Sequence, residues 1–476
     1  MSRKFQCKTI PSKWLEKDGR RLDCGPYMSG ALEARELIKH LHTEPLNSLT
    51  DGYKEGIYNG SPFVRNYVND PEHGVRFLTT SSMLQSDLSN IPLLSKKDAT
   101  SNKLHFLEIK QKMILITCSG SIGRMAYARK DMEGTWSNQD ILKVVADDNK
   151  IKSGYLYAYL SSCFGIPIVL SGTYGAIIQH IEPSHIADLP VPRLRAIENH
   201  VHELIQKSAD MLSEYQRLLS EATEKIFLLS KVSNPSSFEW FSNKKDLGFI
   251  ISSCKLGNSL RAWNHSSRAM KIFNEIKKKK YSLLGELIDD EWLRWRVMFK
   301  RIFAEPEYGI EVITQKPLFN LKPKGKWISK SYLLNHSDKY VVPDETILIA
   351  KQGTLGEKEL YCRCEFITGE KALNRAYSDH CMRVVVKEES IHPGYLYAFL
   401  RSNVGFRLLR SLSEGSKQQD LHWRTVPKIP IPRLELKEEN KIGEMVRLAY
   451  KLRNDAVELD DQARTLVEEA IKTGGS

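Results

Sequence analysis

The chain lacks the segments that direct proteins into membranes or out of the cell. Met1 to Trp14 contain no apolar stretch of signal-peptide length, and the 476 residues include no run of about 18 apolar residues that could span a bilayer. Only 8 cysteines are present, at scattered positions, so we expect no disulfide framework. These absences favour a cytoplasmic protein whose cysteines are small core residues.

Motifs of the common DNA-modifying enzymes are also missing. There is no Asn/Asp-Pro-Pro-Tyr motif or glycine-rich cofactor loop for adenine methylation, and no Gly-x-x-x-x-Gly-Lys-Ser/Thr loop for nucleotide hydrolysis. A nuclease needs clustered carboxylates with a lysine, and Glu108-x-Lys110 offers only a fragment of such a site. Whether Cys362, Cys364 and Cys381 bind zinc is left open. We expect a chain without catalysis of its own.

The composition is that of a soluble globular protein with a basic balance. Hydrophobic residues make up 41% and charged residues 27%, which is enough to build a buried core. The length exceeds that of one compact core and indicates two to four domains. A formal net charge of +12 favours an acidic polymer or surface as partner.

A long internal repeat is the most informative feature. Three blocks recur at an offset of 240 residues: 154–160 with 394–400, 189–194 with 429–434, and 142–145 with 382–385. Upstream, residues 71–75 match 306–310 at an offset of 235, and Phe63-x-Arg65-x-Tyr67 resembles Phe299-x-Arg301-x-Phe303. Solenoid repeats are roughly 20 to 50 residues long, so a unit of this size is expected to be a whole domain. The chain is a pseudo-dimer within one polypeptide.

Each unit is predicted to be a mixed α/β (α+β) domain. Short β-rich runs at 113–117 and 346–350 are followed by glycine turns, and the blocks beginning at 154 and 394 have the composition of a helix. A Pro-x-Pro segment ends each unit and fixes an extended backbone there.

A long amphipathic helix is predicted after each unit. Apolar or small residues recur there at alternating steps of three and four, the spacing of a coiled-coil seam. The seam comprises Val201, Leu204, Ser208, Met211, Tyr215, Leu218, Ala222, Lys225 and Leu229 in the first helix, and Ile442, Met445, Ala449, Leu452, Ala456, Leu459, Ala463, Leu466 and Ala470 in the second. Two narrow stripes are buried most economically against each other; alternatively each helix lies on its own domain.

The repeat and the heptads together divide the chain into four parts. They are a first domain with an N-terminal arm (1–195), a first helix (196–232), a second domain with its lead-in segment (233–434) and a second helix (435–476).

Polar loops of the two units are candidates for contact with DNA. Hydroxyl, amide and cationic side chains can donate to phosphates or bond base edges. The candidates in the glycine turns are Ser119, Ser121 and Arg124 in the first unit, and Lys351, Gln352, Thr354 and Lys358 in the second. Those in the loop after the tyrosine-rich helix are Tyr174, Gln179 and His180, matched by Lys417, Gln418 and Gln419.

Further candidates differ between the units. Asn138 and Gln139 of the first unit are replaced by Ser378 and Asp379 in the second, which is what two different half-site specificities require. Arg65 and Arg301 either contact DNA or anchor each domain through an ion pair. For the loops, too, a tight β-turn or a glutamine that ties a loop to its own backbone remains an alternative.

These parts, in this order, resemble the specificity subunit of type I restriction-modification systems. The resemblance rests on two domains, each closed by a Leu-Pro-x-Pro-like segment and followed by a long helix. In addition, Arg20-Arg21-Leu22-Asp23-Cys24-Gly25-Pro26-Tyr27 is similar to the Arg-Leu-Asp-x-x-Tyr lead-in of recognition domains in that family, with a weaker match at 259–264.

The resemblance implies two tandem target-recognition domains separated by two long antiparallel coiled-coil helices. It implies that each domain binds one half of a gapped, bipartite double-stranded DNA target. The helices would fix the spacing and dock two DNA adenine methyltransferase subunits, which a restriction (translocase) subunit would join. S-adenosylmethionine, ATP and magnesium would then be bound by partner subunits, and no cofactor by this chain. A stand-alone repressor or scaffold, or a self-contained nuclease, are the alternatives.

Overall fold

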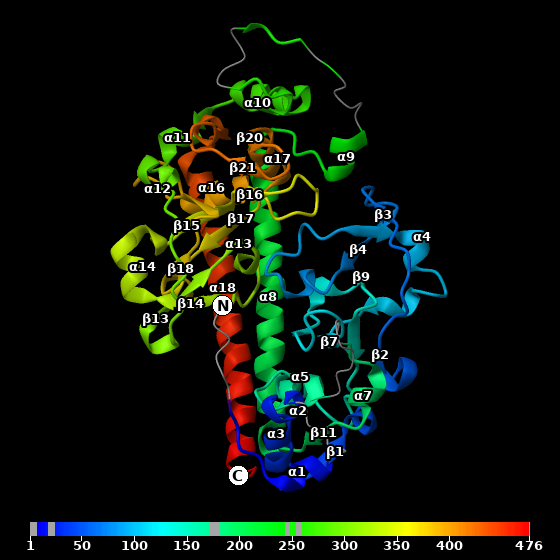
Figure 1. Ribbon diagram of the computed structural model, residues 1–476. Helices are drawn as coiled ribbons and strands as arrows, with labels where there is room; N and C mark the ends of the chain where they lie inside the picture. The colour runs from blue at the N-terminus through cyan, green and yellow to red at the C-terminus, as the bar shows by residue number, and fades with distance from the viewer. Residues whose placement is uncertain are drawn as a thin grey trace.

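Two α/β domains flank a central pair of long helices. The computed structural model describes residues 7–17, 24–171, 180–242, 248, 250–253 and 259–475. Helices α8 (Arg195–Ser230) and α18 (Leu436–Lys472) run side by side through the centre, with the first domain on one side and the second on the other (Figure 1). We call this helix pair the spine.

The first domain contains two larger sheets. Strands β2, β10, β7 and β8 form one, and β3, β5, β4, β9 and β6 form the other, while β1 pairs with β11. Its elements are α1 (Ser12–Lys17), α2 (Gly25–Met28), α3 (Ala31–Ile38), β1 (Thr43–Pro45), β2 (Ile57–Tyr58), β3 (Tyr67–Val68), β4 (Gly74–Leu78), β5 (Leu93–Ser95), α4 (Lys96–Ala99), β6 (Glu108–Ile109), β7 (Ile114–Thr117), β8 (Met125–Tyr127), β9 (Thr135–Ser137), β10 (Ile141–Val144), α5 (Ser153–Leu160), α6 (Gly165–Ser171), α7 (Pro183–Ala187) and β11 (Pro190–Pro192).

The second domain repeats this plan with smaller sheets. The sheets are β17-β15-β19, β14-β13-β18, β16-β21-β20 and β12-β22. The elements are α9 (Ser237–Ser242), α10 (Ser267–Lys277), β12 (Tyr281–Leu283), α11 (Leu284–Leu287), α12 (Asp290–Arg294), β13 (Gly309–Ile313), α13 (Gln315–Leu318), β14 (Lys326–Ser329), α14 (Lys330–His336), β15 (Thr346–Ala350), β16 (Gln352–Gly353), β17 (Cys364–Ile367), α15 (Glu370–Leu373), β18 (Ala376–Tyr377), β19 (Cys381–Val384), α16 (Pro393–Leu400), α17 (Asn403–Ser411), β20 (Ser413–Gly415), β21 (Gln419–Leu421) and β22 (Pro430–Pro432).

Equivalent strands pair in both domains, which confirms the repeat. The parallel pair β4–β9 corresponds to the parallel pair β13–β18, the antiparallel pair β7–β10 to β15–β19, and β1–β11 to β12–β22. The shared tyrosine block has the same role twice, because the hydroxyl of Tyr155 donates to the Pro192 carbonyl and that of Tyr395 to the Pro432 carbonyl. The block therefore fastens each Pro-x-Pro strand beside the start of a long helix.

The glycines that open the tyrosine block let its helix approach the spine closely. A Cβ on Gly154 would lie 2.9 Å from the backbone of His202 in α8, and one on Gly394 would lie 2.5 Å from the Gly443 carbonyl oxygen in α18. Helices α5 and α16 are therefore packed against the spine by backbone contact, and both are buried along their length.

The two long helices are antiparallel. The first half of α8 shares a core with the last residues of α18 and the first domain, whereas its second half shares a core with the start of α18 and the second domain. Near the middle, the Ser208 hydroxyl donates to the Ala456 carbonyl at 2.7 Å, and the rings of Tyr215 and Tyr450 meet edge to face. The alternative of two separate helices, each on its own domain, is wrong.

Eight of the 18 predicted seam residues are not fully buried. Buried as predicted are Val201, Leu204, Ser208, Tyr215, Leu218 and Ala222 of α8, and Ile442, Ala449, Ala456 and Ala463 of α18. In α18 the alternate positions are shifted by one: Val446, Arg453, Asp460, Val467 and Ile471 are buried, and Met445, Leu452, Leu459, Leu466 and Ala470 are half-buried. In α8, Met211 and Lys225 are half-buried and Leu229 is exposed.

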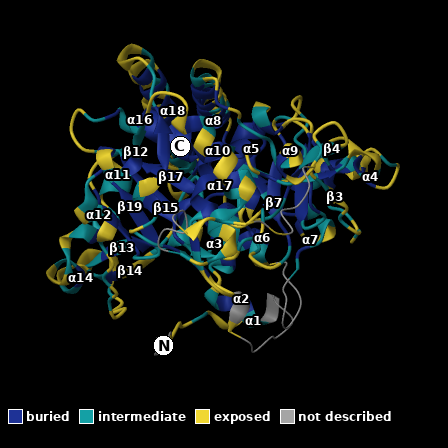
Figure 2. Ribbon diagram, turned by 90° about the horizontal axis from the view of Figure 1, so that it is seen from above, coloured by how far each residue is buried: buried dark blue, intermediate teal, exposed yellow. Residues whose placement is uncertain are grey.

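Two of the shifted positions hold charged residues that are buried in ion pairs. Buried Arg453 pairs with Glu365 of β17, and buried Asp460 pairs with Lys322 of the second domain. Hydrophobic periodicity does not predict charged residues in a seam, but ion-pair partners from outside the helix allow these two to be buried. Viewed along the spine, buried residues fill both domains and the strips where they meet the helices (Figure 2).

Within the part of the chain that the structure describes, no single helix is long and apolar enough to cross a membrane. Helices α5 and α6 would meet the length and composition test only together, as a pair bent by 72°.

Candidate nucleic-acid interface

The two predicted glycine turns follow equivalent strands. Ile116 of β7 pairs with Leu142, and Ile349 of β15 pairs with Met382. Because Leu142 and Met382 are matched in the repeat, the turns correspond at the 233-residue offset between Ile116 and Ile349. Arg124 of the first turn is therefore the counterpart of an acidic residue, Glu357, in the second.

The first turn is held tightly by its glycines. Gly120 and Gly123 have φ angles of +74° and +76°, which side-chain-bearing residues rarely adopt. The Thr117 hydroxyl donates to the Ser121 carbonyl at 2.6 Å and closes the turn. Ser121 and Arg124 remain exposed at its tip, and Ser119 is half-buried.

The second turn is anchored on its own domain. Glu357 forms an ion pair with Arg407 of α17, and Arg410 donates to the Leu355 and Gly356 carbonyls. Burial alone would raise the pKa of Glu357, but the Arg407 contact outweighs burial and lowers it. Thr354 stays exposed.

The second predicted loop lies beside the glycine turn in the second domain, and so does His180, with which this loop ends in the first. Ser119 pairs with His180 in an isolated antiparallel bridge, and Gln352 pairs with Asp420 between β16 and β21. In the second domain the loop is the hairpin β20–β21, which exposes Lys417 and Gln418 at its tip. The second domain thus joins two polar loops into one edge, and in the first domain the glycine turn and His180 lie at the equivalent place; we call each of these the reading edge.

Three predicted contact residues are buried and bonded inside the chain. Asn138 is 3% exposed and accepts hydrogen bonds from Arg65 and from the Asp140 amide. Gln419 is also 3% exposed and is bonded to Arg261 and to the Ser416 carbonyl. Lys351 is 5% exposed. These three support the reading edges from within and present no side chain to a ligand.

The lead-in segment explains the burial of Gln419. Arg261 donates to the Gln419 side chain at 2.6 Å and to the Ser413 carbonyl at 2.9 Å, and Trp263 donates to the Arg410 carbonyl. Residues 259–264, the weaker match to a recognition-domain lead-in, thereby fix the base of the hairpin. Gln352 is half-buried and bonded to Gln315 and Asp420.

Arg65 and Gln139 meet at a second polar cluster. Arg65 donates to the Gln139 side chain at 3.1 Å and lies 3.6 Å from a carboxylate oxygen of Asp140. Lys358 of the second domain lies over the ring of Tyr67 nearby. Burial and, secondarily, the charge of Arg65 lower the pKa of Lys358. Arg65 is thus an anchor that stays one-third exposed, while Arg301 is fully on the surface.

Tyr174 and Gln179 lie outside the described residues, as do Arg20 to Asp23 of the first lead-in.

A basic cleft between the domains was not predicted. Its volume is about 610 Å³, and it is lined by the first glycine turn, the spine and residues 316–324 of the second domain. Arg124, Lys316 and Lys324 are exposed at this cleft. The lysines lie outside the repeated blocks; the spacing Lys322-x-Lys324-x-Lys326 was the signal that could have found them.

Each domain also buries a cation beneath its polar turn. Lys143 donates to the Ile141 carbonyl at 3.1 Å, and its counterpart Arg383 donates to the Cys381 carbonyl at 2.8 Å. Burial lowers the pKa of Lys143 to about 7. Arg383 also donates to the Tyr377 and Ser378 carbonyls just before Asp379, whereas the Ile141 carbonyl that Lys143 reaches belongs to its own strand, β10.

No group of three or more His, Cys, Asp or Glu side chains that could hold a metal ion occurs among the described residues. Cys362, Cys364 and Cys381 are buried, and burial raises the pKa of each thiol, that of Cys364 to about 12 and that of Cys381 to about 11. The three thiols pack as core side chains, whereas His380 is half-buried.

Comparisons with known proteins gave only structural likenesses. No protein-family model and no curated protein matches the sequence. A type I restriction-modification S subunit from M. genitalium is 14% identical, with 91% of this chain and 95% of that chain covered and a TM-score of 0.35. The HsdS subunit from Thermoanaerobacter tengcongensis is 12% identical, with 91% and 96% covered and a TM-score of 0.26.

A third chain comes from a structure described as showing complex assembly and conformational transition of the type I R-M system. It is 11% identical, with 91% and 97% covered and a TM-score of 0.25. Structural likenesses of this degree do not establish a function.

Proposed function

We propose that this chain is the DNA-reading specificity subunit of a type I restriction-modification complex. The observation that carries the proposal is the duplicated reading edge. Two copies of one buried frame present different polar groups at equivalent positions, such as Arg124 against Glu357. Two readers that differ in this way suit a target made of two dissimilar half-sites.

The exposed and half-buried candidates of the two domains form the proposed contact surface. Hydroxyls and amides suit base edges and phosphates, and the cations suit guanine and phosphates. The surface comprises Ser119, Ser121, Arg124, Gln139 and His180 of the first domain, and Arg301, Gln352, Thr354, Lys358, Lys417 and Gln418 of the second. Tyr174 and Gln179 are kept as proposed contacts from the sequence alone.

Partner subunits supply the chemistry in this proposal. DNA adenine methyltransferase subunits dock on the spine and bring S-adenosylmethionine, and a restriction subunit brings ATP and magnesium. At about 1.5 Å per residue the 36-residue helix α8 is about 54 Å long, which corresponds to about 16 base pairs of DNA. A spine of this length can hold two readers on one duplex with a gap between their half-sites.

Mapping methylated adenines in the host genome tests the proposal. The expected result is one asymmetric, gapped motif that disappears when the gene for this chain is deleted. In a second step, residues 46–195 are exchanged for those of a related chain, and only one half of the motif should change. A continuous motif, or a change in both halves, would contradict the proposal that each domain recognises one half-site.

A stand-alone repressor or scaffold would use the same surface without a methyltransferase. Purification of the tagged chain from its host separates the two functions, since co-purification of a methyltransferase supports the specificity subunit. A gapped binding site without any associated methylation supports the repressor.

A further inference from the structure

The two domains touch each other directly at a point of local two-fold symmetry. The Ser86 amide donates to the Phe319 carbonyl at 3.0 Å, and the Leu321 amide donates to the Leu84 carbonyl at 2.8 Å. Between these bonds, Gln85 and Asn320 form an isolated antiparallel bridge. We call residues 84–89 and 319–322 the junction.

The offset of the repeat relates one half of the junction to the other. Adding 235, the offset between residues 71–75 and 306–310, carries Leu84 onto Phe319 and Ser86 onto Leu321. The two hydrogen bonds are therefore equivalent under the symmetry of the repeat, and each domain donates in one of them and accepts in the other. The pseudo-two-fold axis of the chain passes between Gln85 and Asn320.

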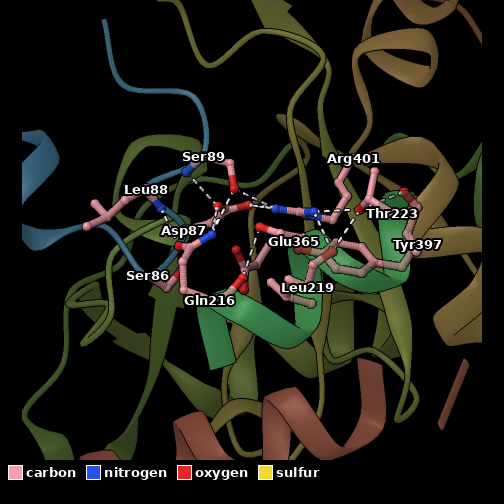
Figure 3. A network of polar contacts seen from close by, with 12 residues as sticks. Ser86, Asp87, Leu88, Ser89, Gln216, Leu219, Thr223, Glu365, Tyr397 and Arg401 are labelled. Carbon is pink, nitrogen blue, oxygen red and sulfur yellow. Dashed lines mark hydrogen bonds and ion pairs between the residues drawn. The ribbon is translucent and has the colours of Figure 1, made fainter. Parts of the chain in front are cut away.

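Asp87 fixes the first half of the junction (Figure 3). Its carboxylate accepts from Arg401, directly after α16 of the second domain, at 2.6 Å, and from Gln216 of α8 at 3.2 Å. Arg401 also donates to the Thr223 hydroxyl and the Leu219 carbonyl of α8. One buried network thus joins the first domain, the second domain and the spine.

The network is densely bonded and shielded from water, and of the Arg401 guanidinium only Nε has no hydrogen-bond partner within the described residues. The side chains of Arg401 and Asp87 are 6% and 19% exposed, and Ser89 and the Leu88 amide complete the bonds to Arg401 and Gln216. Burial opposes ionisation of Asp87, but the charge of Arg401 and the bonds from Ser89 prevail and hold the pKa of Asp87 well below its usual range.

Lys322 fixes the second half with the opposite charge. It is the counterpart of Asp87 at the offset of 235 and pairs with Asp460 and Asp461 of α18. The equivalent loops of the two domains are therefore held by ion pairs of reversed sign. Neither loop could take the place of the other, because Asp87 would then face Asp460 and Asp461.

We propose that the junction, through Asp87–Arg401 and Lys322–Asp460/Asp461, sets the separation of the two reading edges and so selects the length of the DNA gap. This inference rests on the proposed function. One extra base pair moves a half-site by about 3.4 Å and turns it by about 35° around the duplex, so only a stiff separation of the readers can reject it. Besides the contact of Lys358 with the Tyr67 ring, the junction joins the two domains directly, and it does so through backbone hydrogen bonds and a buried ion pair.

The test combines gap selection with amide exchange. The double variant Asp87→Asn with Arg401→Gln removes both charges and keeps the polar groups, which avoids an unpaired buried charge. Lys322→Met removes the second ion-pair contact. Arg217→Gln is the control, because Arg217 lies on the same helix as Gln216 and pairs with Glu214 and Glu221 at the surface.

Each full-length protein, together with its methyltransferase partner, selects from a random library of duplexes about 30 base pairs long, which exceeds the length of the spine. Wild type and control are expected to prefer one gap over gaps one base pair longer or shorter by about tenfold or more. In the Asp87/Arg401 double variant and in Lys322→Met, the preference should fall to about threefold or less, with both half-site sequences unchanged. Hydrogen exchange at the Ser86 and Leu321 amides should accelerate in the same proteins.

Two outcomes overturn the inference. One is a wild-type gap preference that the double variant retains in full; the other is unchanged amide exchange at Ser86 and Leu321, which needs no DNA. If wild type selects no gapped motif while exchange accelerates in the variants, the proposed function fails and with it the assignment of gap length, whereas the junction itself stands.

Discussion

The two α/β domains bury a cation at the same position but hold it differently. Arg383 donates to the carbonyls of Lys339, Tyr377, Ser378 and Cys381 and lies 3.9 Å from the centre of the Trp295 ring. Lys143 in the first domain donates to one carbonyl, that of Ile141, and lies 5.7 Å from the centre of the Tyr58 ring. Burial lowers the pKa of Arg383 to about 10 and that of Lys143 to about 7, so at pH 7 the second domain keeps its buried charge and the first can lose it.

The reading edges differ in a parallel way. In the first domain Arg124 of the glycine turn is exposed and lines the basic cleft. In the second domain Glu357 forms an ion pair with Arg407, and the exposed residues of the edge include Lys417 and Gln418 at the hairpin tip. The glycine turn thus exposes a cation in the first domain and buries its acidic counterpart in an ion pair in the second.

Loss of the Arg383 side chain should produce the largest effect. Arg383→Met leaves several buried carbonyls without a donor, and we expect the free energy of unfolding to fall by about 3 kcal/mol or more. Urea denaturation monitored by fluorescence measures the loss. The matched variant Lys143→Met should cost little at pH 7, and an equal loss in both variants would refute the contrast between the domains.

The pH dependence of stability should sharpen the same contrast. Because burial lowers the pKa of Lys143 to about 7, the unfolded chain binds more protons than the folded chain between about pH 7 and pH 10. Stability should therefore rise with pH in this window, by at most about 1.4 kcal/mol per unit from this residue. In Lys143→Met this contribution should vanish, and an unchanged slope would show that Lys143 stays charged. Urea unfolding at pH 7, 8, 9 and 10 provides the measurement.

The hairpin tip should affect one half-site only. Replacing Lys417 and Gln418 by alanine is expected to weaken binding of the complete DNA target about tenfold, or about 1.4 kcal/mol. Sequence preference should relax in the half-site read by the second domain. Lys472→Ala, at the far end of α18, serves as the control. Equal weakening for all sequences would mean that the tip contacts phosphates.

Arg124 should have the smallest effect, seen in the salt dependence of binding. Arg124→Gln removes one cation from the basic cleft, so the slope of log K against log salt should decrease in magnitude by about 1. Fluorescence anisotropy at several salt concentrations measures the slope. Lys472→Gln should leave it unchanged, and a loss of sequence preference with an intact slope would assign Arg124 to a base.

The fold followed from the sequence because the repeat lies mainly in buried, periodic residues. The blocks at 154 and 394 match because both pack their glycine against the spine and bond their tyrosine to a proline carbonyl. The seam was predicted only in part. Arg453 and Asp460 were missed because they are charged and their partners lie far away in the chain.

The reading edges were harder to predict residue by residue. Polar side chains in a glycine-rich loop can point outward or bond inward, and local sequence does not distinguish the two. Gln419 turns inward because Arg261, 158 residues earlier, supplies its partner, and Asn138 because Arg65 does. Lys417 and Gln418, next to Gln419 in the sequence, remain exposed.

Arg453 and Asp460 occupy the same place in successive heptads of α18, seven residues or about 10.5 Å apart. A slip of α18 by one heptad in one direction would bring Arg453 against Lys322, and a slip in the other would bring Asp460 against Glu365. Either error sets like charges face to face in a buried site. The opposite charges of Arg453 and Asp460 therefore permit α18 only one register relative to its neighbours.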